Sequence, residues 1–154
     1  MTMWLNSPAF PDAGAVPVRF TCDGENLSPP LEWGGAPAQA RSFVILCEDP
    51  DAPSGLWRHW AAYDIPADRS RLPDGASLRA AELGFKQGVN DFRQTGYGGP
   101  CPPRGHGEHH YQLRLLALSS DHLPVGGRAS CREVEAAARQ SVLAETGLAG
   151  LYER

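Results

Sequence analysis

The sequence lacks any apolar stretch approaching the roughly 20 residues that a helix needs to span a bilayer, and residues 1–10 lack a basic segment followed by an apolar run. We therefore expect neither a transmembrane segment nor a secretory signal, which makes the cytoplasm the predicted location. An excess of positive charge is also missing, because the formal net charge is −4. Nucleic acid and anionic membranes select basic patches, so neither is an expected partner.

The chain also lacks the motifs that mark several enzyme and metal-binding classes. It has neither a G-x-S-x-G elbow nor an H-E-x-x-H helix, and its cysteines show no C-x-x-C spacing. These absences argue against the common hydrolases, zinc proteases, zinc ribbons and thioredoxin-type motifs. We therefore predict a protein without a metal ion or a cofactor.

The four cysteines are Cys22, Cys47, Cys101 and Cys131. In a cytoplasmic protein they are expected to be reduced thiols. Cys47 falls inside an apolar run and is predicted to be part of the core. Cys22 and Cys101 lie in polar, loop-like surroundings and could approach each other, so a disulfide between these two is the alternative.

The composition favours a β-rich fold. With 154 residues, of which 42% are hydrophobic and 21% charged, the chain has the size and composition of one folded domain covering residues 1–154. Its 17 glycines and 14 prolines interrupt the sequence every few residues, which favours short strands over long helices. We predict strands at 42–47, 59–65 and 110–119, with weaker candidates at 18–22 and 31–33. The run 42–47 (SFVILC) is continuously apolar after Ser42, as in a strand buried on both faces.

Only one segment has a convincing helical pattern. Ser130 and Glu133 have the spacing of a capping box, and apolar residues recur at helical spacing from Val134 to Val142. Gly147 offers a stop, after which a second short helical turn is expected. The predicted fold class is therefore mostly β, with a few short helices, one of them near the C-terminus.

A long stretch without clear periodicity lies between residues 66 and 107. Compact domains seldom leave a segment of this length without structure. Part of it, 96–107 (GYGGPCPPRGHG), is mostly glycine and proline. Because ordering such a loop costs conformational entropy, we interpret it as a wall of a binding site.

Polar residues cluster at the ends of the predicted strands. Residues 48–53 (EDPDAP) follow the first apolar strand, where acidic side chains would reach the rim of the core. Residues 57–60 (WRHW) begin the next strand, and alternation places Trp57 and His59 on one face and Arg58 and Trp60 on the other. Taken alone, the first cluster is more typical of a polar turn, and the histidine of the second is more typical of a structural histidine.

The third cluster, 106–111 (HGEHHY), enters the last predicted strand. His109 and Tyr111 share a face that continues into the core, while the residue between them points away. If the three strand ends converge, Asp49, His59, His109 and Tyr111 form a compact polar pocket. Imidazole and backbone N–H groups can donate hydrogen bonds to an anion, so this pocket is predicted to bind a phosphate-sized group.

These clusters resemble the phosphatidylethanolamine-binding protein family, and in particular its bacterial, Raf-kinase-inhibitor-like branch of YbhB/YbcL type. The resemblance rests on the D-P-D-A-P segment 49–53, the Trp–His pair 57–59, the G-x-H-x-Y segment 107–111, and the segments 20–33, 90–92 and 96–103. It covers roughly residues 6–118, with a looser tail.

The resemblance implies a β-sandwich and a shallow pocket for phosphate-like groups, phospholipid headgroups among them. The positions that match the family's pocket are Asp49, Ala52, Pro53, Trp57, His59, Gly99, Pro100, His109 and Tyr111. One departure is His110, which replaces the family's usual arginine, so the orientation of Asp49 or Asp51 and the pH dependence of binding are in question. Animal members also restrain protein kinases, which implies a protein partner.

The predicted function is therefore non-enzymatic binding of a small anion. One alternative is acid–base hydrolysis of phosphoesters by Asp49 and the histidines, since histidine is a suitable general base near neutral pH. Another, suggested by the family alone, is inhibition of a kinase or serine protease through exposed loops such as 68–75. A homodimer is also expected to be feasible through apolar surface near the pocket.

Overall fold

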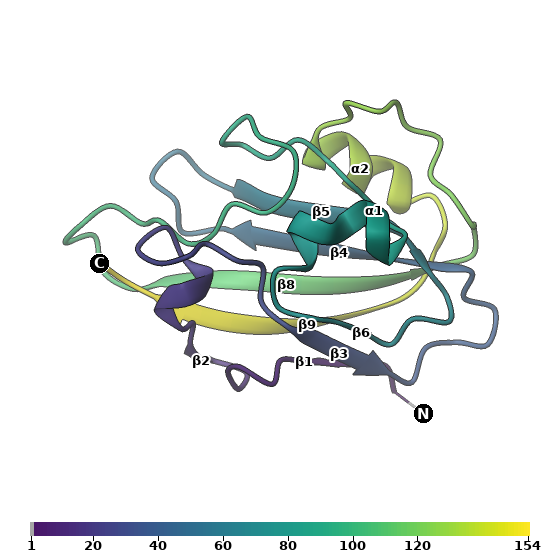
Figure 1. Cartoon of the computed structure of the whole chain (residues 1–154), viewed down its shortest axis with the longest axis horizontal. Helices are drawn as coiled ribbons and strands as arrows, with labels where there is room; N and C mark the ends of the chain where they lie inside the picture. The colour runs from purple at the N-terminus through teal and green to yellow at the C-terminus, as the bar shows by residue number, and fades with distance from the viewer. Residues whose placement is uncertain (1) are drawn as a thin grey trace.

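The computed structural model describes residues 2–154, which form two β-sheets, a small one packed on one face of a large one (Figure 1). The elements are β1 Trp4–Asn6, β2 Gly14–Ala15, the 3-10 turn η1 Val18–Phe20, β3 Leu31–Gly34, β4 Ser42–Asp49, β5 Trp57–Pro66, β6 Arg71–Leu72, the 3-10 turn η2 Ala76–Arg79, α1 Ala80–Leu83, β7 Lys86–Gln87, β8 His109–Leu118, α2 Cys131–Ala138 and β9 Val142–Tyr152. The predicted class, mostly β with a few short helices, is confirmed. None of the helices in residues 2–154 has the length and apolar character needed to cross a membrane.

The large sheet has the strand order β2-β9-β8-β4-β5-β7. Its centre is β4, which pairs antiparallel with both β5 and β8. Every residue of β4 is buried, as the apolar run 42–47 predicts for a strand covered on both faces. The predicted strand 59–65 is confirmed within β5, and the predicted strand 110–119 is confirmed as β8, which ends one residue earlier, at Leu118.

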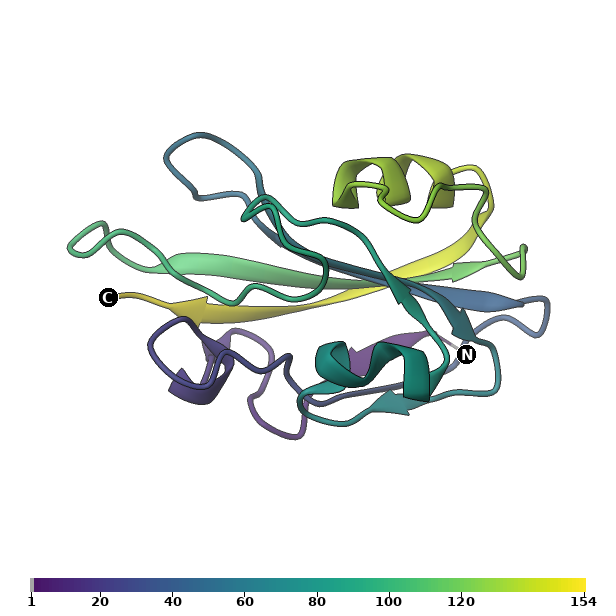
Figure 2. The same ribbon diagram turned by 45° about the horizontal axis from the view of Figure 1, so that its top comes forward.

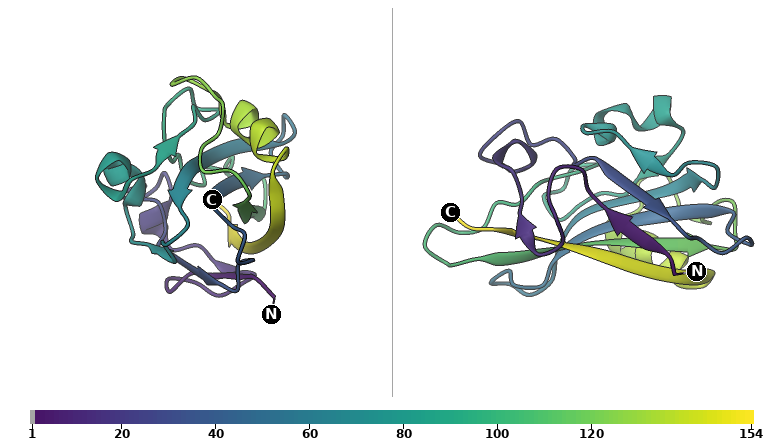
Figure 3. Two further views of the ribbon diagram at one scale, coloured as in Figure 1. Left: turned by 90° about the vertical axis from the view of Figure 1, so that its right-hand side faces the viewer. Right: turned by 90° about the horizontal axis from the view of Figure 1, so that it is seen from below.

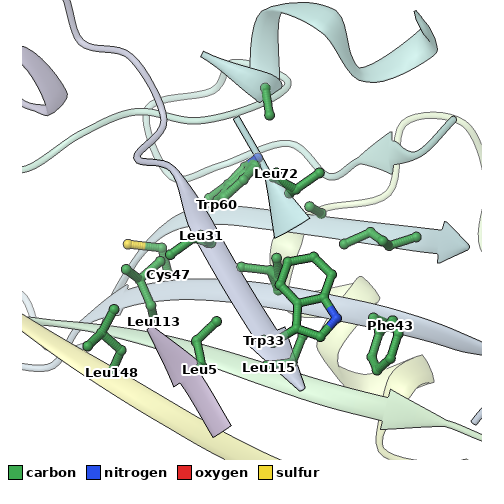
Figure 4. Packing of buried hydrophobic residues seen from close by; sticks show 14 of the residues in the cluster. Leu5, Leu31, Trp33, Phe43, Cys47, Trp60, Leu72, Leu113, Leu115 and Leu148 are labelled. Atoms are coloured by element: carbon green, nitrogen blue, oxygen red, sulfur yellow. The ribbon is translucent and has the colours of Figure 1, made fainter. Parts of the chain in front are cut away.

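The small sheet, with the order β1-β3-β6, covers one face of the large sheet. Figure 4 shows side chains from its strands, such as Leu5, Leu31 and Trp33, meeting Cys47 and Leu113 of the large sheet. This cluster forms the larger of the two cores. The weaker prediction of a strand at 31–33 is therefore confirmed, whereas 18–22 is not a strand but contains the 3-10 turn η1.

Helix α2 covers the opposite face of the large sheet (Figure 2). It begins with the predicted capping box: the Ser130 hydroxyl accepts from the Glu133 N–H, and the Glu133 carboxylate accepts from the Ser130 N–H. Val134 and Ala138 point to the sheet and are fully buried. This smaller core lies between α2 and the outer face of β4, β5 and β8.

The C-terminal part of the prediction is wrong. The helix ends at Ala138, and Val142–Tyr152, expected to be helical, forms β9, the longest strand described. β9 pairs with β8 along its whole length, from Val142 opposite Leu118 to Tyr152 opposite His109. That ladder is a long-range interaction, and it outweighs the local helical spacing of the apolar residues.

A β-bulge overturns one expectation for β5. The register places Trp60 opposite Cys47 but Arg58 opposite Glu48, so one extra residue, His59, lies between two pairs. Arg58 consequently points to α2, where its Nη1 donates to Glu48 Oε2 at 2.9 Å, while Trp60 packs in the larger core. Arg58 and Trp60 therefore do not share a face, because a bulge breaks the two-residue alternation.

The cysteine prediction is also wrong in part. Cys22 and Cys101 form a disulfide across a sequence separation of 79, so the alternative to four reduced thiols holds for this pair. Cys47 and Cys131 are free and buried, and Cys47 is part of the core as predicted. The disulfide fastens the glycine- and proline-rich segment 96–107 to the loop after η1.

Candidate functional site

A pocket of about 260 Å³ opens at one end of the large sheet. The end of β4 and the starts of β5 and β8 meet there, and the loops 50–56 and 99–108 project from this end, near the C-terminus (Figures 1 and 3). The residues that line it are Asp49, Ala52, Pro53, Ser54, Trp57, His59, Phe92, Cys101, Pro102, Pro103, His109 and Tyr111. The structure thus brings together seven of the nine predicted positions, all except Gly99 and Pro100.

Asp49 and His109 form a buried hydrogen-bonded pair at this pocket. Asp49 Oδ2 lies 2.7 Å from His109 Nδ1, and Asp49 Oδ1 accepts from the Asp51 N–H at 2.8 Å. The other ring nitrogen of His109, Nε2, lies 2.7 Å from Nδ1 of His106, on the exposed loop before β8. Because Asp49 accepts at both oxygens, it holds the Nδ1 proton of His109 and leaves Nε2 to accept from His106.

His59 is buried at the bulge of β5. Its Nδ1 lies 2.6 Å from the carbonyl oxygen of Gly98, which can only accept, so Nδ1 carries the proton. Burial lowers the pKa of His59, although the Gly98 carbonyl and the Asp49 carboxylate partly oppose that shift. The ring is therefore neutral at neutral pH and its Nε2 carries a lone pair.

Two buried donors at the pocket have no partner among residues 2–154. They are the Oη–H of Tyr111, a side chain with 2% of its surface exposed, and the indole Nε1–H of Trp57. Burial, and next the Asp49 carboxylate, raise the pKa of Tyr111, so its hydroxyl stays protonated. Buried polar groups without a partner carry a free-energy cost, and a ligand that accepts from them would remove it.

Phe92 is a pocket residue that the sequence prediction missed. Its ring makes edge contacts with Trp57, at a centroid distance of 5.4 Å, and with His59, at 5.3 Å. The segment 90–92 was noted only as part of a family resemblance, and no local pattern placed it near the other clusters. Cys101, Pro102 and Pro103 complete the wall, which confirms that the 96–107 segment borders the pocket.

Gly99 and Pro100 lie behind this wall instead of lining it. The Gly99 N–H donates to Asn26 Oδ1 at 2.8 Å, and the Pro100 carbonyl accepts from the Cys22 N–H at 3.1 Å. A Cβ at Gly99 would come within 2.3 Å of the Phe20 carbonyl oxygen, so only glycine fits this close approach. Together with the disulfide, these contacts position the wall.

His110, which stands where the family usually has arginine, holds Asp51. Its backbone N–H donates to Asp51 Oδ2 at 2.8 Å, and its Nδ1 lies 2.7 Å from the same oxygen. These two hydrogen bonds, the backbone one first, lower the pKa of Asp51. Asp51 in turn donates its N–H to Asp49, so Asp49 is oriented without an arginine.

The pocket contains a fixed negative charge but no fixed positive charge. Asp49 is the one acidic side chain among the lining residues, and none of those residues is lysine or arginine. Within residues 2–154, no group of three or more histidine, cysteine or acidic side chains is placed to hold a metal ion. Besides this carboxylate, the polar side-chain groups around the pocket are therefore imidazole, phenol, indole and the Ser54 hydroxyl.

The fold and this site together define a β-sandwich protein with a small pocket at one end of its large sheet. The family model described as phosphatidylethanolamine-binding protein matches residues 6–153. The chain therefore belongs to the phosphatidylethanolamine-binding protein family, as the resemblance of its motifs indicated.

Individual relatives agree with this assignment. A Methanothermobacter thermautotrophicus protein named UPF0098 protein is 46% identical over 99% of both chains. One of the same name from Aquifex aeolicus is 42% identical, over 99% of this chain and 89% of its own. The crystal structure of Escherichia coli YbcL, described as a new member of the mammalian PEBP family, matches with a TM-score of 0.94 and 32% identity, over 100% of this chain and 99% of its own. None of these names is that of an enzyme.

Proposed function

We propose that the protein binds a small anion, such as phosphate or a phosphorylated headgroup, in the pocket at the end of the large sheet, without a chemical reaction. The observation that supports this most directly is the convergence of Asp49, His59, His109 and Tyr111, from three strands, on one pocket. The buried and unpartnered hydroxyl of Tyr111 is a donor that a bound anion would satisfy.

The size of the pocket supports a small ligand. At about 260 Å³ it lies at or below the lower end of pockets that bury drug-sized ligands, roughly 300–1,000 Å³. Apolar side chains make up much of its wall, among them Trp57, Phe92 and Pro102. Such surroundings strengthen each hydrogen bond to an anion, because water competes less for the donors.

His109 can serve the ligand only after a rearrangement. Its Nδ1 is held by Asp49 and its Nε2 by His106. His106 lies on a loop between Gly105 and Gly107, both in the left-handed region and both without neighbours close to the position of a Cβ. We infer that this loop turns His106 away, so that Nε2 of His109 faces the ligand and accepts from a protonated phosphate oxygen.

Hydrolysis of phosphoesters is a weaker candidate. The Asp49–His109 pair has the geometry of a histidine oriented by a carboxylate, as in many general bases. However, the nitrogen that would take a proton, Nε2, already faces His106. Turnover of p-nitrophenyl phosphate by the wild type that disappears in His109→Ala would replace binding with hydrolysis as the proposed function.

A protein partner, such as a kinase or protease, and a homodimer remain proposals that rest on the family and on exposed apolar side chains near the pocket. Leu56 and Phe92 are 46% and 39% exposed. Sedimentation at two protein concentrations tests the dimer, and inhibition assays test the partner.

The cytoplasmic location also remains a proposal from the sequence. The disulfide between Cys22 and Cys101 instead favours an oxidising compartment, because structural disulfides seldom persist in a reducing cytosol. Thiol labelling of the protein in intact cells distinguishes the two compartments. In a reducing cytosol Cys22 and Cys101 would be free thiols and would be labelled, whereas in an oxidising compartment they would be protected by the disulfide.

Calorimetry tests the anion proposal. Inorganic phosphate and phosphoethanolamine are titrated into the wild type, His109→Ala and the control His122→Ala, which removes an exposed histidine bound to Asp64 away from the pocket. We expect saturable binding that is lost in His109→Ala and kept in His122→Ala. Absence of binding to the wild type, or equal binding to all three proteins, would contradict the proposal.

A further inference from the structure

The charges around the pocket indicate which anions it accepts. We propose that the pocket selects singly charged tetrahedral oxyanions, such as phosphodiesters and sulfate monoesters, and discriminates against the phosphomonoester dianion. This inference rests on the proposed anion binding and adds the charge of the ligand to it.

Asp49 supplies a permanent negative charge at the pocket. Its side chain is nearly fully buried, and both of its oxygens accept hydrogen bonds, from the Asp51 N–H and from His109 Nδ1. With both oxygens accepting, Asp49 offers a ligand no donor. A ligand held by the Tyr111 hydroxyl would therefore lie close to a carboxylate.

The positive charges near the pocket are engaged elsewhere. Arg58, next to His59 in sequence, points to the opposite face of the sheet, where it pairs with Glu48. Arg154 approaches the pocket wall, with Nη1 3.4 Å from Cys101 Sγ, but it pairs with Asp23 at 3.2 Å. Neither arginine is among the lining residues, so neither offsets the charge of Asp49 there.

His59, Tyr111 and Trp57 are neutral, and of these three only Tyr111 and Trp57 have a donor without a partner among residues 2–154. His59 keeps its single proton on Nδ1, which the Gly98 carbonyl holds, and burial opposes a second proton. Tyr111 and Trp57 donate without carrying charge. The other titratable groups around these donors are of two kinds. Asp51 and Asp91 are acidic. The ring nitrogens of His106, His109 and His110 lie against a carboxylate or another histidine.

Neutral donors can bind a ligand with one negative charge. A second negative charge on the ligand increases its repulsion from the Asp49 carboxylate, which no cation among the lining residues offsets in this poorly hydrated site. The repulsion between unit charges a few ångströms apart is far larger at an effective dielectric constant of about 20 than in water. An alkyl phosphate acquires its second charge with a pKa near 6, so its charge state depends on pH, whereas a sulfate ester keeps one charge.

Methyl sulfate and methyl phosphate test this directly, because they have the same shape and differ in charge only above about pH 6. Both are titrated by calorimetry into the full-length, disulfide-bonded protein at pH 8 and pH 5. We expect methyl sulfate to bind at least about tenfold more tightly at pH 8, and the two affinities to converge at pH 5. Protonation of the protein affects both ligands, so the ratio reports the charge of the ligand.

The variant Asp49→Asn tests whether the Asp49 carboxylate causes the difference in affinity between methyl sulfate and methyl phosphate. This variant is expected to reduce the ratio at pH 8, and circular dichroism checks that it is folded; if it is not, the wild-type ratio decides. Equal binding at pH 8, or tighter binding of methyl phosphate, would overturn the selectivity while leaving anion binding intact. Absence of binding by both ligands at both pH values would overturn the proposed function and the selectivity together.

Discussion

The two faces of the large sheet differ in whether their polar side chains have partners, although the same strands contribute the side chains on both faces. Glu48 and Asp49 are neighbours on β4, and Arg58 and His59 are neighbours on β5. One member of each pair points to α2, where Glu48 and Arg58 pair with each other and Arg58 also pairs with Glu135. The other lines the pocket, where two donors have no partner within residues 2–154 and none of the lining residues is a lysine or arginine that could pair with the carboxylate.

The face under α2 carries a network of three arginines and three glutamates. Its members are Arg58, Arg114, Arg139, Glu48, Glu135 and Glu145. Burial raises the pKa of Glu48. Burial also favours a higher pKa for Glu135. Hydrogen bonds to Glu135, of which the one from Arg58 has the largest effect, outweigh burial and lower the pKa of Glu135 to about 2.

Paired charges and unpartnered polar groups thus occupy opposite faces of one sheet. The paired charges connect β4, β5, β8, α2 and β9 and help to specify how these elements pack. Because they are already in ion pairs, they are not available to bind a ligand. Buried donors without a partner destabilise the folded state, so their position around a pocket indicates a ligand. The variants that follow alter residues on one face of the large sheet, and we expect the properties of the other face to be unaffected. The exception is the variant that loosens the pocket wall.

The largest effect is expected at the disulfide that holds the pocket wall. Cys22→Ser/Cys101→Ser opens a loop with a sequence separation of 79 and should lower the free energy of unfolding by about 4 kcal/mol, mainly through the entropy of the unfolded chain. Phosphate affinity should fall as well. Urea unfolding and calorimetry measure both, and wild type under a strong reductant should match the variant; unchanged stability would show that the disulfide does not restrain the chain.

Breaking the network should change stability alone. Arg114 contacts Glu48, Glu135 and Glu145, so Arg114→Met leaves the buried Glu48 poorly compensated and should cost about 3 kcal/mol. The control Arg41→Met removes an exposed pair with Asp121 and should cost less than about 1 kcal/mol. Urea unfolding compares the two. Loss of phosphate binding by folded Arg114→Met would contradict the separation of the faces.

The third prediction concerns the pH dependence of stability on the pocket face. Because the folded state lowers the pKa of His59, the unfolded chain binds more protons once the pH falls below about 6.5. The stability that His59 contributes is thus complete above that pH and declines below it, by at most about 1.4 kcal/mol per pH unit. Urea unfolding between pH 7.5 and 5.5 should show a smaller decline for His59→Gln than for the wild type and His122→Ala.

The smallest effect is expected at His106. If this histidine competes with the ligand for Nε2 of His109, His106→Ala should raise phosphate affinity by a few fold, about the strength of one hydrogen bond. His110→Ala is the matched control, since its ring faces Asp51 and not the pocket. Calorimetry measures both, and weaker binding by His106→Ala would instead make His106 a donor to the ligand.

Much of the pocket could be predicted because its residues sit where strands end. The apolar run 42–47 located β4, and alternation placed His109 and Tyr111 on the face that leads to the core. Alternation failed at Arg58 and Trp60, since the bulge is set by pairing with β4 and leaves no local signal. Phe92 was missed because only the folded chain brings its loop beside Trp57.

The strand β9 could not be predicted for a related reason. Its apolar residues fit a helix as well as a strand, and only the ladder with β8 decides between them. Gly147, interpreted as a helix stop, lies inside that strand. Gly150 allows the N-terminal segment to pack closely, because a Cβ there would be 2.5 Å from Val16 Cγ2.

The most direct test of the account is a nuclear magnetic resonance titration of the isotope-labelled protein with inorganic phosphate at pH 6. We predict saturable shifts of the Trp57 indole and of the His59 and His109 rings, with the side-chain signals of Arg58 and Arg114 unchanged. That result would place binding on the face with unpartnered donors. Shifts centred on the arginines, or no saturable shifts at the pocket, would contradict it.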